Sequence, residues 1–234
     1  MVQVSLNDTA NVWVIIPAHN ESEAIGGVLT ELTELPYQVV VVDDGSIDGT
    51  LEAVLRHPVI ALRHATNLGQ GAALRTGIAF ALQHPSARYI VTFDADGQHR
   101  PVDIQRLVAA SQQGNVDVVL GSRFILGGKA VHIGFIRRLV LWVALQFTHL
   151  MTGLPLTDTH NGLRLFTRQA ASQIKITQNR MSHASEILSQ VASLKLRYKE
   201  IPIEVAYTSY SRRKGQSVWN GINILWEMII GRIK

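Results

Sequence analysis

The sequence predicts an α/β protein with a doubly wound, mostly parallel β-sheet, followed by a C-terminal helical and basic region. In the first 120 residues, short unbroken runs of β-branched apolar residues alternate with helical patterns. Unbroken apolar runs are typical of parallel strands that are covered on both faces. A polar cluster also follows each of the first four runs, at the carboxyl ends of strands where sites in such sheets lie.

The expected strands of this first part cover residues 12–17, 38–43, 59–63, 89–94 and 116–121. The helical patterns between them cover residues 22–35, 48–57, 70–84 and 101–113. Ser46 or Asp48 is a plausible N-cap of the second helix, and Pro101 takes the first position of the fourth. Alternation of strand and helix implies right-handed crossovers.

After Arg123 the pattern changes. The elements expected there are a helix over 131–153, a polar loop over 157–162, a strand over 163–167, a helix over 183–194, a strand over 196–206, a basic loop over 209–217 and a final apolar helix to Lys234. The sequence shows no internal repeat and no linker. We therefore expect one domain over residues 1–234.

Composition excludes several classes of protein. The chain has 234 residues, of which 47% are apolar and 17% charged, so it can bury a full core and is not a disordered chain. The absence of cysteine excludes a disulfide framework, a thiolate zinc site and a cysteine nucleophile, and favours a reducing compartment. We expect no signal peptide, and the longest apolar run, 139–147, is far below the roughly 20 residues that span a bilayer.

The charge is divided unevenly along the chain. Residues 1–120 contain six lysines and arginines against thirteen aspartates and glutamates, whereas the remainder contains sixteen against five. An acidic half suits a metal cation, and a basic half suits phosphate, nucleic acid or an anionic membrane. No helix-turn-helix, zinc finger or aromatic RNA-binding pattern is present, so nucleic acid is not the expected partner.

A metal site is expected after the fourth strand, at Asp94, Asp96 and Gln98. Residues at i, i+2 and i+4 of an extended strand end project to the same side, which makes an oxygen-only site suited to Mg²⁺ or Mn²⁺. The alternative is a solvated turn. Asp44, after the second strand, is the expected ligand contact of the Asp43–Asp44 pair, although a turn and helix cap would explain the same residues.

Further candidates lie in other loops. His19 and Glu21 follow the first strand and suit contact with a base, although a histidine there is often structural. Arg123 and a basic loop that begins at Arg212 are candidate phosphate clamps, and the alternative is a solvated charge run. Asp158 suits a base or an acceptor-orienting residue, or else a loop-stabilising one. The glycine-rich segment 67–71 lacks the third glycine of a dinucleotide fingerprint, so a tight turn explains it.

Taken together, these motifs resemble family 2 glycosyltransferases of the GT-A (Rossmann-like) fold, and among them the polyprenyl-phosphate sugar transferases of the dolichyl-phosphate mannose synthase group. The resemblance extends from about 12 to 218. The motifs that carry it are IPAHNE at 16–21, DDGS at 43–46, NLGQG at 67–71, DADGQH at 94–99, GSR at 121–123 and the Arg212-x-x-Gly215-x-Ser217 loop.

The resemblance implies a nucleotide-sugar donor, Mg²⁺ or Mn²⁺ as cofactor, and inversion at the anomeric carbon. Residues 1–122 would form the nucleotide-sugar and metal half, and 123–234 the acceptor and membrane-facing half. The nucleoside and donor positions are Pro17, His19, Glu21, Val42, Asp44, Asp94, Ala95 and Asp96. The metal positions are Asp94, Asp96 and Gln98, the phosphate or acceptor positions are Arg123, Arg212 and Ser217, and the catalytic positions are Asp96 and Asp158.

Two positions depart from the family pattern, because Gln70 and Val218 stand where lysine is frequent. Many relatives also continue into membrane-spanning helices.

The expected function is transfer of a sugar to a polyprenyl phosphate such as a dolichyl or undecaprenyl phosphate. A saccharide acceptor in surface-polysaccharide assembly is one alternative, and a non-catalytic nucleotide-binding, membrane-recruited module is another. Helices over 131–150 and 218–232, with Trp142, Phe147, Trp219 and Trp226, suit peripheral docking at the cytoplasmic face of a membrane, or else packing on the sheet or on a second subunit. A homo-oligomer or a membrane-anchored partner fits the same helices.

Overall fold

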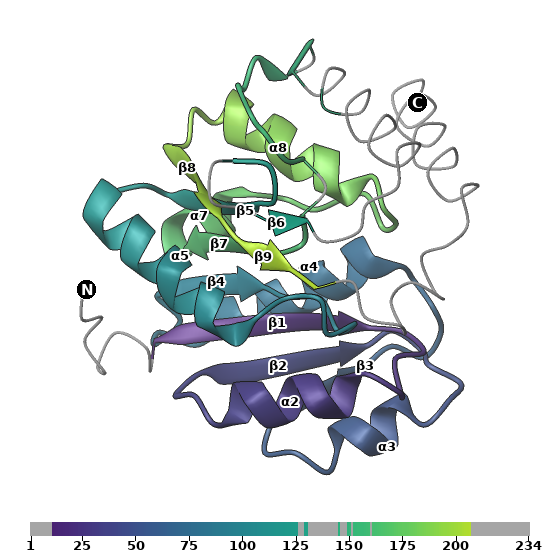
Figure 1. The fold of residues 1–234 in the computed structure, drawn as a ribbon. Coiled ribbons are helices and arrows are strands. Elements are labelled where there is room, and N and C mark those ends of the chain that lie inside the picture. The colour runs from purple at the N-terminus through teal and green to yellow at the C-terminus, as the bar shows by residue number, and fades with distance from the viewer. Residues whose placement is uncertain are drawn as a thin grey trace.

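The computed structural model describes residues 11–125, 129–130, 145, 149–150, 152–159 and 161–206. Its centre is a seven-stranded sheet in the order β3-β2-β1-β4-β7-β5-β8 (Figure 1). All neighbouring strands are parallel except β7, which is antiparallel to both β4 and β5. The predicted doubly wound, mostly parallel sheet is therefore confirmed.

The first part of the chain forms β1 (Val12–Ala18), α2 (Ile25–Thr33), β2 (Gln38–Asp43), α3 (Thr50–Val54), β3 (Ile60–Arg63), α4 (Gln70–Leu82), β4 (Tyr89–Thr92), α5 (Pro101–Gly114) and β5 (Val118–Ser122). The later part forms β6 (Lys129–Ala130), β7 (Arg164–Thr167), α7 (Arg168–Gln173), α8 (His183–Ser193), β8 (Tyr198–Pro202) and β9 (Glu204–Val205). The short strands β6 and β9 pair with each other in parallel.

The central strands bury both faces, as their unbroken apolar runs predict, whereas the edge strands β3 and β8 are only partly buried. Along β1, Val14 and Ile16 pack with residues of α2 and α5 on one face, whereas Trp13 and Ile15 pack with residues of α4, α7 and α8 on the other. Successive side chains of a strand point to opposite faces, so this run supplies two cores at once. Figure 1 shows α2 below the sheet and α8 above the strands of the later part.

Several boundaries differ from the sequence expectation. The expected helix over 48–57 is the short α3, for which Gly49 is the N-cap, and Asp48 instead accepts a hydrogen bond from the Thr50 amide at 3.0 Å. The expected strand over 196–206 is interrupted at Ile203, whose amide donates to the Ser122 carbonyl at 3.0 Å, so it becomes β8 and β9. The helix α7 was not expected.

The antiparallel strand β7 decides where the later loops lie. Its first residue, Arg164, is paired with Thr92 at the carboxyl end of β4 and with Leu120 near the carboxyl end of β5. The loop before β7 therefore reaches the same sheet edge as the loops that follow the parallel strands. Asn161 and Gly162 join the candidate site for this reason.

No helix within the described residues is long and apolar enough to cross a membrane. Of the expected helix over 131–153, only residues 145, 149–150 and 152–153 are described, and the final helix lies outside the described residues.

Candidate active site

A cavity of about 610 Å³ opens at the edge where β1, β2, β4 and β5 end and β7 begins. The predicted site residues that line it are Pro17, His19, Glu21, Asp44, Asp94, Ala95, Asp96, Gln98 and Arg123. Val42 does not line it, because its fully buried side chain packs in the core that faces α4. Arg212 and Ser217 lie outside the described residues.

Asp94 is held in place by groups from three parts of the chain. Its Oδ1 accepts a hydrogen bond from Gln70 Nε2 at 3.2 Å, and its Oδ2 lies 3.2 Å from His99 Nε2. A Cβ on Gly162 would collide with this carboxylate, so the backbone of Gly162 packs directly on it. Burial would raise the pKa of Asp94, but nearby His99, His183 and Arg164 outweigh burial and lower the pKa.

Asp96 has the opposite electrostatic environment. Burial, and then the charge of Asp94, raise its pKa to about 6, and the charge of Glu21 adds to the rise. The Gln98 backbone amide donates to Asp96 at 3.1 Å, which partly offsets the rise in pKa. Gln98 Nε2 also donates to Asp96, at 2.6 Å. Two carboxylates that repel each other in a cavity are typical of a site for a cation.

The donor atoms here fit Mg²⁺ or Mn²⁺. Asp94 and Asp96 supply carboxylate oxygens and Gln98 an amide oxygen, which are ligands that hard cations prefer. Within the described part of the chain, no group of three or more histidine, cysteine or acidic side chains is arranged to hold a metal. The donor set is two carboxylates and one amide oxygen, and a bound phosphate or water would fill the remaining ligand positions.

The loops after β1 and β2 are tied together. The Asn20 amide donates to Ser46 Oγ at 3.0 Å, and Asn20 Oδ1 accepts from the Ile47 amide at 3.0 Å. Ser46, which the sequence made a candidate helix cap, thus connects the two loops. His19 Nδ1 lies 2.9 Å from the Asp44 carbonyl oxygen, which places the ring on the cavity wall.

The Asp44 carboxylate is largely engaged by the protein itself. Its Oδ1 accepts from the Leu68 amide at 3.0 Å and lies 2.7 Å from His64 Nδ1, and its Oδ2 accepts from the Gly69 amide at 2.7 Å. The resemblance implies that Asp44 contacts the nucleoside. The structure shows that Asp44 also fixes the glycine-rich segment 67–71, a role that spacing alone did not indicate.

That glycine-rich segment and the start of α4 pack against residues 178 and 179. The Ala72 amide, at the start of α4, donates to the Asn179 carbonyl at 3.2 Å. A Cβ on Gly71 would collide with the Gln178 carbonyl, and a Cβ on Gly69 with that of Asn179. The glycines are therefore needed for close packing of residues 178 and 179 against the first turn of α4.

Arg123 lines the cavity, and Asp158 lies behind it. Asp158 Oδ2 accepts a hydrogen bond from Arg123 Nε at 2.6 Å, and Asp158 Oδ1 accepts one from Arg123 Nη2 at 2.8 Å. Both side chains of this ion pair are buried. Asp158 in turn is positioned by Glu200 of β8, which accepts from the Asp158 amide at 3.1 Å and from the Thr157 amide at 2.9 Å. The Asp158 carboxylate does not line the cavity.

Sequence reasoning missed several cavity residues, among them Arg164, Arg180 and His183. Arg164 is buried and donates to the carbonyls of Thr159, Asn161 and Ala184. Burial lowers the pKa of Arg164 to about 10, although the charges of Asp94 and Asp158 act to raise it. Arg164 therefore remains a cation at neutral pH. An arginine within the apolar strand expected over 163–167 was the available signal.

The fold matches that of solved GT-A glycosyltransferases. Glucosyl-3-phosphoglycerate synthase from Mycobacterium tuberculosis, in a crystal structure with Mn²⁺, uridine diphosphate and glucosyl-3-phosphoglycerate, superposes with a TM-score of 0.71 at 16% identity. The match covers 97% of this chain and 85% of that one. The architecture is thus that of the GT-A glycosyltransferases.

Sequence comparison then gives the family. The family model "Glycosyl transferase family 2" matches residues 13–175, so the chain belongs to this family of glycosyltransferases. The protein MJ1222 of Methanocaldococcus jannaschii is 36% identical over 99% of this chain and 96% of its own length. UDP-N-acetylglucosamine–dolichyl-phosphate N-acetylglucosaminyltransferase of Methanococcus voltae is 32% identical over 94% of this chain and 95% of its own.

Proposed function

We propose that this glycosyltransferase transfers a sugar from a nucleotide-sugar donor to a polyprenyl phosphate. The observation that carries the proposal is that one cavity is lined both by Asp94 and Asp96, which follow β4, and by Arg123, which follows β5. Similar proteins include the dolichyl-phosphate enzyme of Methanococcus voltae and an undecaprenyl-phosphate mannosyltransferase of Micrococcus luteus, which is 31% identical over 94% of this chain.

The first step is binding of the donor. Asp94, Asp96 and Gln98 would hold Mg²⁺ or Mn²⁺, which neutralises charge on a nucleoside diphosphate leaving group when bound. His19, Glu21 and Asp44 would surround the nucleoside, because they lie together at the ends of β1 and β2. His99 and Gln70 keep the Asp94 carboxylate in one orientation.

The chemical step is a single in-line displacement. An oxygen of the acceptor phosphate forms a bond to the anomeric carbon while the bond from that carbon to the diphosphate breaks, so the configuration inverts. A phosphate monoester has a second pKa of about 6 and is already anionic at neutral pH, so no strong base is needed. Asp158 fits this scheme as the residue that holds Arg123, because its carboxylate faces that guanidinium.

We propose that the chain works as one unit, with residues 1–122 supplying the donor side and 123–234 the acceptor side. Asn161, Gly162, Arg164 and His183 of the second part share a cavity with Asp94 of the first, which supports this division of work. We also propose peripheral binding at the cytoplasmic membrane face, where the lipid acceptor would lie. Flotation of the protein with anionic liposomes tests this, and protein that stays in the dense fraction contradicts it.

The transfer itself is tested with radiolabelled nucleotide sugars, Mn²⁺ or Mg²⁺ and a polyprenyl phosphate. We expect label in the organic phase, its loss with EDTA and in Asp96→Asn, and an inverted anomeric configuration of the product by NMR. If, in a parallel reaction with a saccharide acceptor, label moves only into the saccharide, the proposed lipid acceptor is wrong and the acceptor is a sugar. Binding of nucleotide without transfer from any donor would instead favour a non-catalytic module.

A further inference from the structure

The segment between α7 and α8 is fixed against the start of α4. Besides the contacts of Gln178 and Asn179 with the glycines, Arg75 of α4 donates from Nη1 to the Ile176 carbonyl at 3.2 Å and to Asn179 Oδ1 at 3.1 Å. Gly71, in the first turn of α4, has no side chain to separate the two backbones. The segment is therefore held on its α4 side by both backbone and side-chain contacts.

The same segment is held on its other side by Glu186 of α8. This carboxylate accepts hydrogen bonds from the Thr177 amide at 3.0 Å, from the Gln178 amide at 3.0 Å and from the Thr177 hydroxyl. The next turn is closed by the Arg180 carbonyl, which accepts from the His183 amide at 3.2 Å and lies 2.7 Å from His183 Nδ1. The backbone of Arg180 is thus placed by contacts on both sides.

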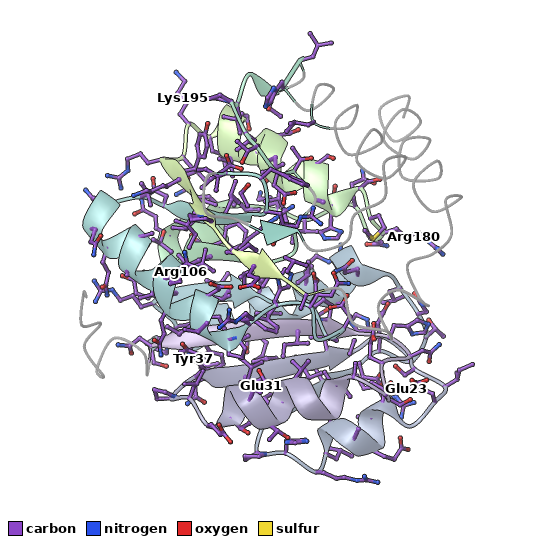
Figure 2. All side chains as sticks on the ribbon, in the orientation of Figure 1. Glu23, Glu31, Tyr37, Arg106, Arg180 and Lys195 are labelled. Carbon is purple, nitrogen blue, oxygen red and sulfur yellow. The ribbon has the colours of Figure 1, made fainter. Side chains whose placement is uncertain are left out.

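This arrangement presents the Arg180 side chain at the mouth of the cavity. Arg180 lines the cavity while remaining exposed, and Figure 2 shows it at the turn before α8, near α4. Within the described residues no carboxylate forms an ion pair with it. The other two arginines of the cavity wall differ, since Arg123 is paired with Asp158 and Arg164 is buried against backbone carbonyls.

We infer that Arg180 binds a phosphate group of a substrate. A guanidinium matches the geometry of phosphate oxygens with two parallel hydrogen bonds. The acidic side of the cavity, at Glu21, Asp94 and Asp96, repels an incoming anion, so a cation at the mouth favours its entry and retention. The inference rests on the proposed function, and the phosphate belongs either to the diphosphate of the donor or to the acceptor.

The test compares wild type with Arg180→Ala and Arg180→Lys, and uses Arg56→Ala as the matched control because Arg56 is exposed and does not line the cavity. Calorimetry measures binding of UDP and of GDP with Mn²⁺, and separately of a short-chain polyprenyl phosphate. We expect Arg180→Ala to weaken one of these ligands about tenfold, Arg180→Lys to restore part of the loss, and Arg56→Ala to change nothing.

The affected ligand identifies the source of the phosphate. Weaker nucleoside diphosphate binding and a higher KM for the donor assign Arg180 to the diphosphate, whereas weaker lipid phosphate binding and a higher KM for the acceptor assign it to the acceptor. Affinities within twofold of wild type for all ligands overturn the inference. The calorimetry decides this even if wild type transfers no sugar, an outcome that would overturn the proposed function alone. If Arg180→Ala melts at a lower temperature than wild type, Arg180→Gln is measured in its place.

Discussion

Asp158 binds Arg123 through both of its carboxylate oxygens, at 2.6 Å and 2.8 Å, and lies behind the arginine rather than on the cavity wall. The two residues are brought together from the end of β5 and from the loop before β7. Such a pair needs both members, because removing one leaves an uncompensated buried charge. The arrangement supports a role for Asp158 in positioning Arg123.

Asp158→Asn is therefore expected to lower the free energy of unfolding by about 3 kcal/mol and to reduce turnover at every pH. Urea denaturation and a pH–rate profile of the variant check this. A positioning residue leaves the shape of the profile unchanged. If the variant regained full activity at high pH, a role for Asp158 as general base would replace the positioning role. Asp117→Asn, at a more exposed pair with Arg197 far from the cavity, is the control and is expected to cost less.

Glu200 gives a prediction for the pH dependence of stability. Burial raises the pKa of Glu200, and the hydrogen bonds from Thr157 and Asp158, which lower the pKa, offset only part of this rise. The folded chain thus keeps this proton to higher pH than the unfolded chain does. Glu200 therefore contributes less to the free energy of unfolding as pH rises. The decrease starts near the ordinary pKa of glutamate and is complete above the raised pKa of the folded chain.

Glu200→Gln removes this titration. Urea denaturation of wild type and variant between pH 4 and pH 8, in EDTA, is expected to show wild type losing stability relative to the variant as pH rises. A wild type that instead gains on the variant would mean that the hydrogen bonds to Thr157 and Asp158 outweigh burial.

Asp94→Asn and Asp96→Asn are expected to change stability in opposite directions in the absence of metal. Asp94 has a lowered pKa, so its charge stabilises the fold, whereas Asp96 has a pKa raised to about 6, so its charge at pH 7.5 is unfavourable. We expect Asp94→Asn to lower the free energy of unfolding and Asp96→Asn to raise it, the latter by on the order of 1 kcal/mol. Both variants are expected to lose at least about 100-fold in turnover. Equal signs in urea denaturation with EDTA would refute the electrostatic description.

Gly71→Ala tests the docking of residues 178 and 179 on α4. The added Cβ collides with the Gln178 carbonyl, so we expect a loss of about 2 kcal/mol and weaker binding of the ligand that contacts Arg180. Gly27→Ala is the matched control, because no atom lies within 4 Å of its added Cβ in α2. That change is expected to be neutral or to stabilise by up to about 1 kcal/mol. Thermal melts of the two variants distinguish a specific collision from a general effect of alanine.

The first five strands were predictable from sequence because each is a short apolar run; β1, β2, β4 and β5 are buried on both faces, and the edge strand β3 is half-buried. The carboxylates Asp94 and Asp96 were predictable for the same reason, since they follow such a run. The contacts that shift the pKa values of these two carboxylates in opposite directions could not be predicted from the sequence. Arg164, His183 and the backbone of Gly162 reach Asp94 only because β7 enters the sheet antiparallel, and no local pattern specifies that direction.

The segment 67–71 shows a second reason why sequence alone does not predict the site. Its glycines and amides suit a turn, and a turn is what local residues specify. Their partners, Asn179 and the Asp44 carboxylate, come from elsewhere in the chain. The sequence expectation was incomplete wherever a side chain is occupied by a distant partner, as for Asp44, Asp158 and Ser46.

The chain leaves the sheet at Ser122 and returns at Arg164 at nearly the same point, where the Gly121 amide donates to the Leu163 carbonyl at 3.0 Å and the Ser122 and Thr157 hydroxyls lie 2.6 Å apart. Because the ends of this excursion are joined, we expect β5 and β7 to keep their positions when residues 124–156 are replaced by the corresponding stretch of a relative. Transfer assays of such a graft would test the proposal that the later part of the chain determines acceptor choice.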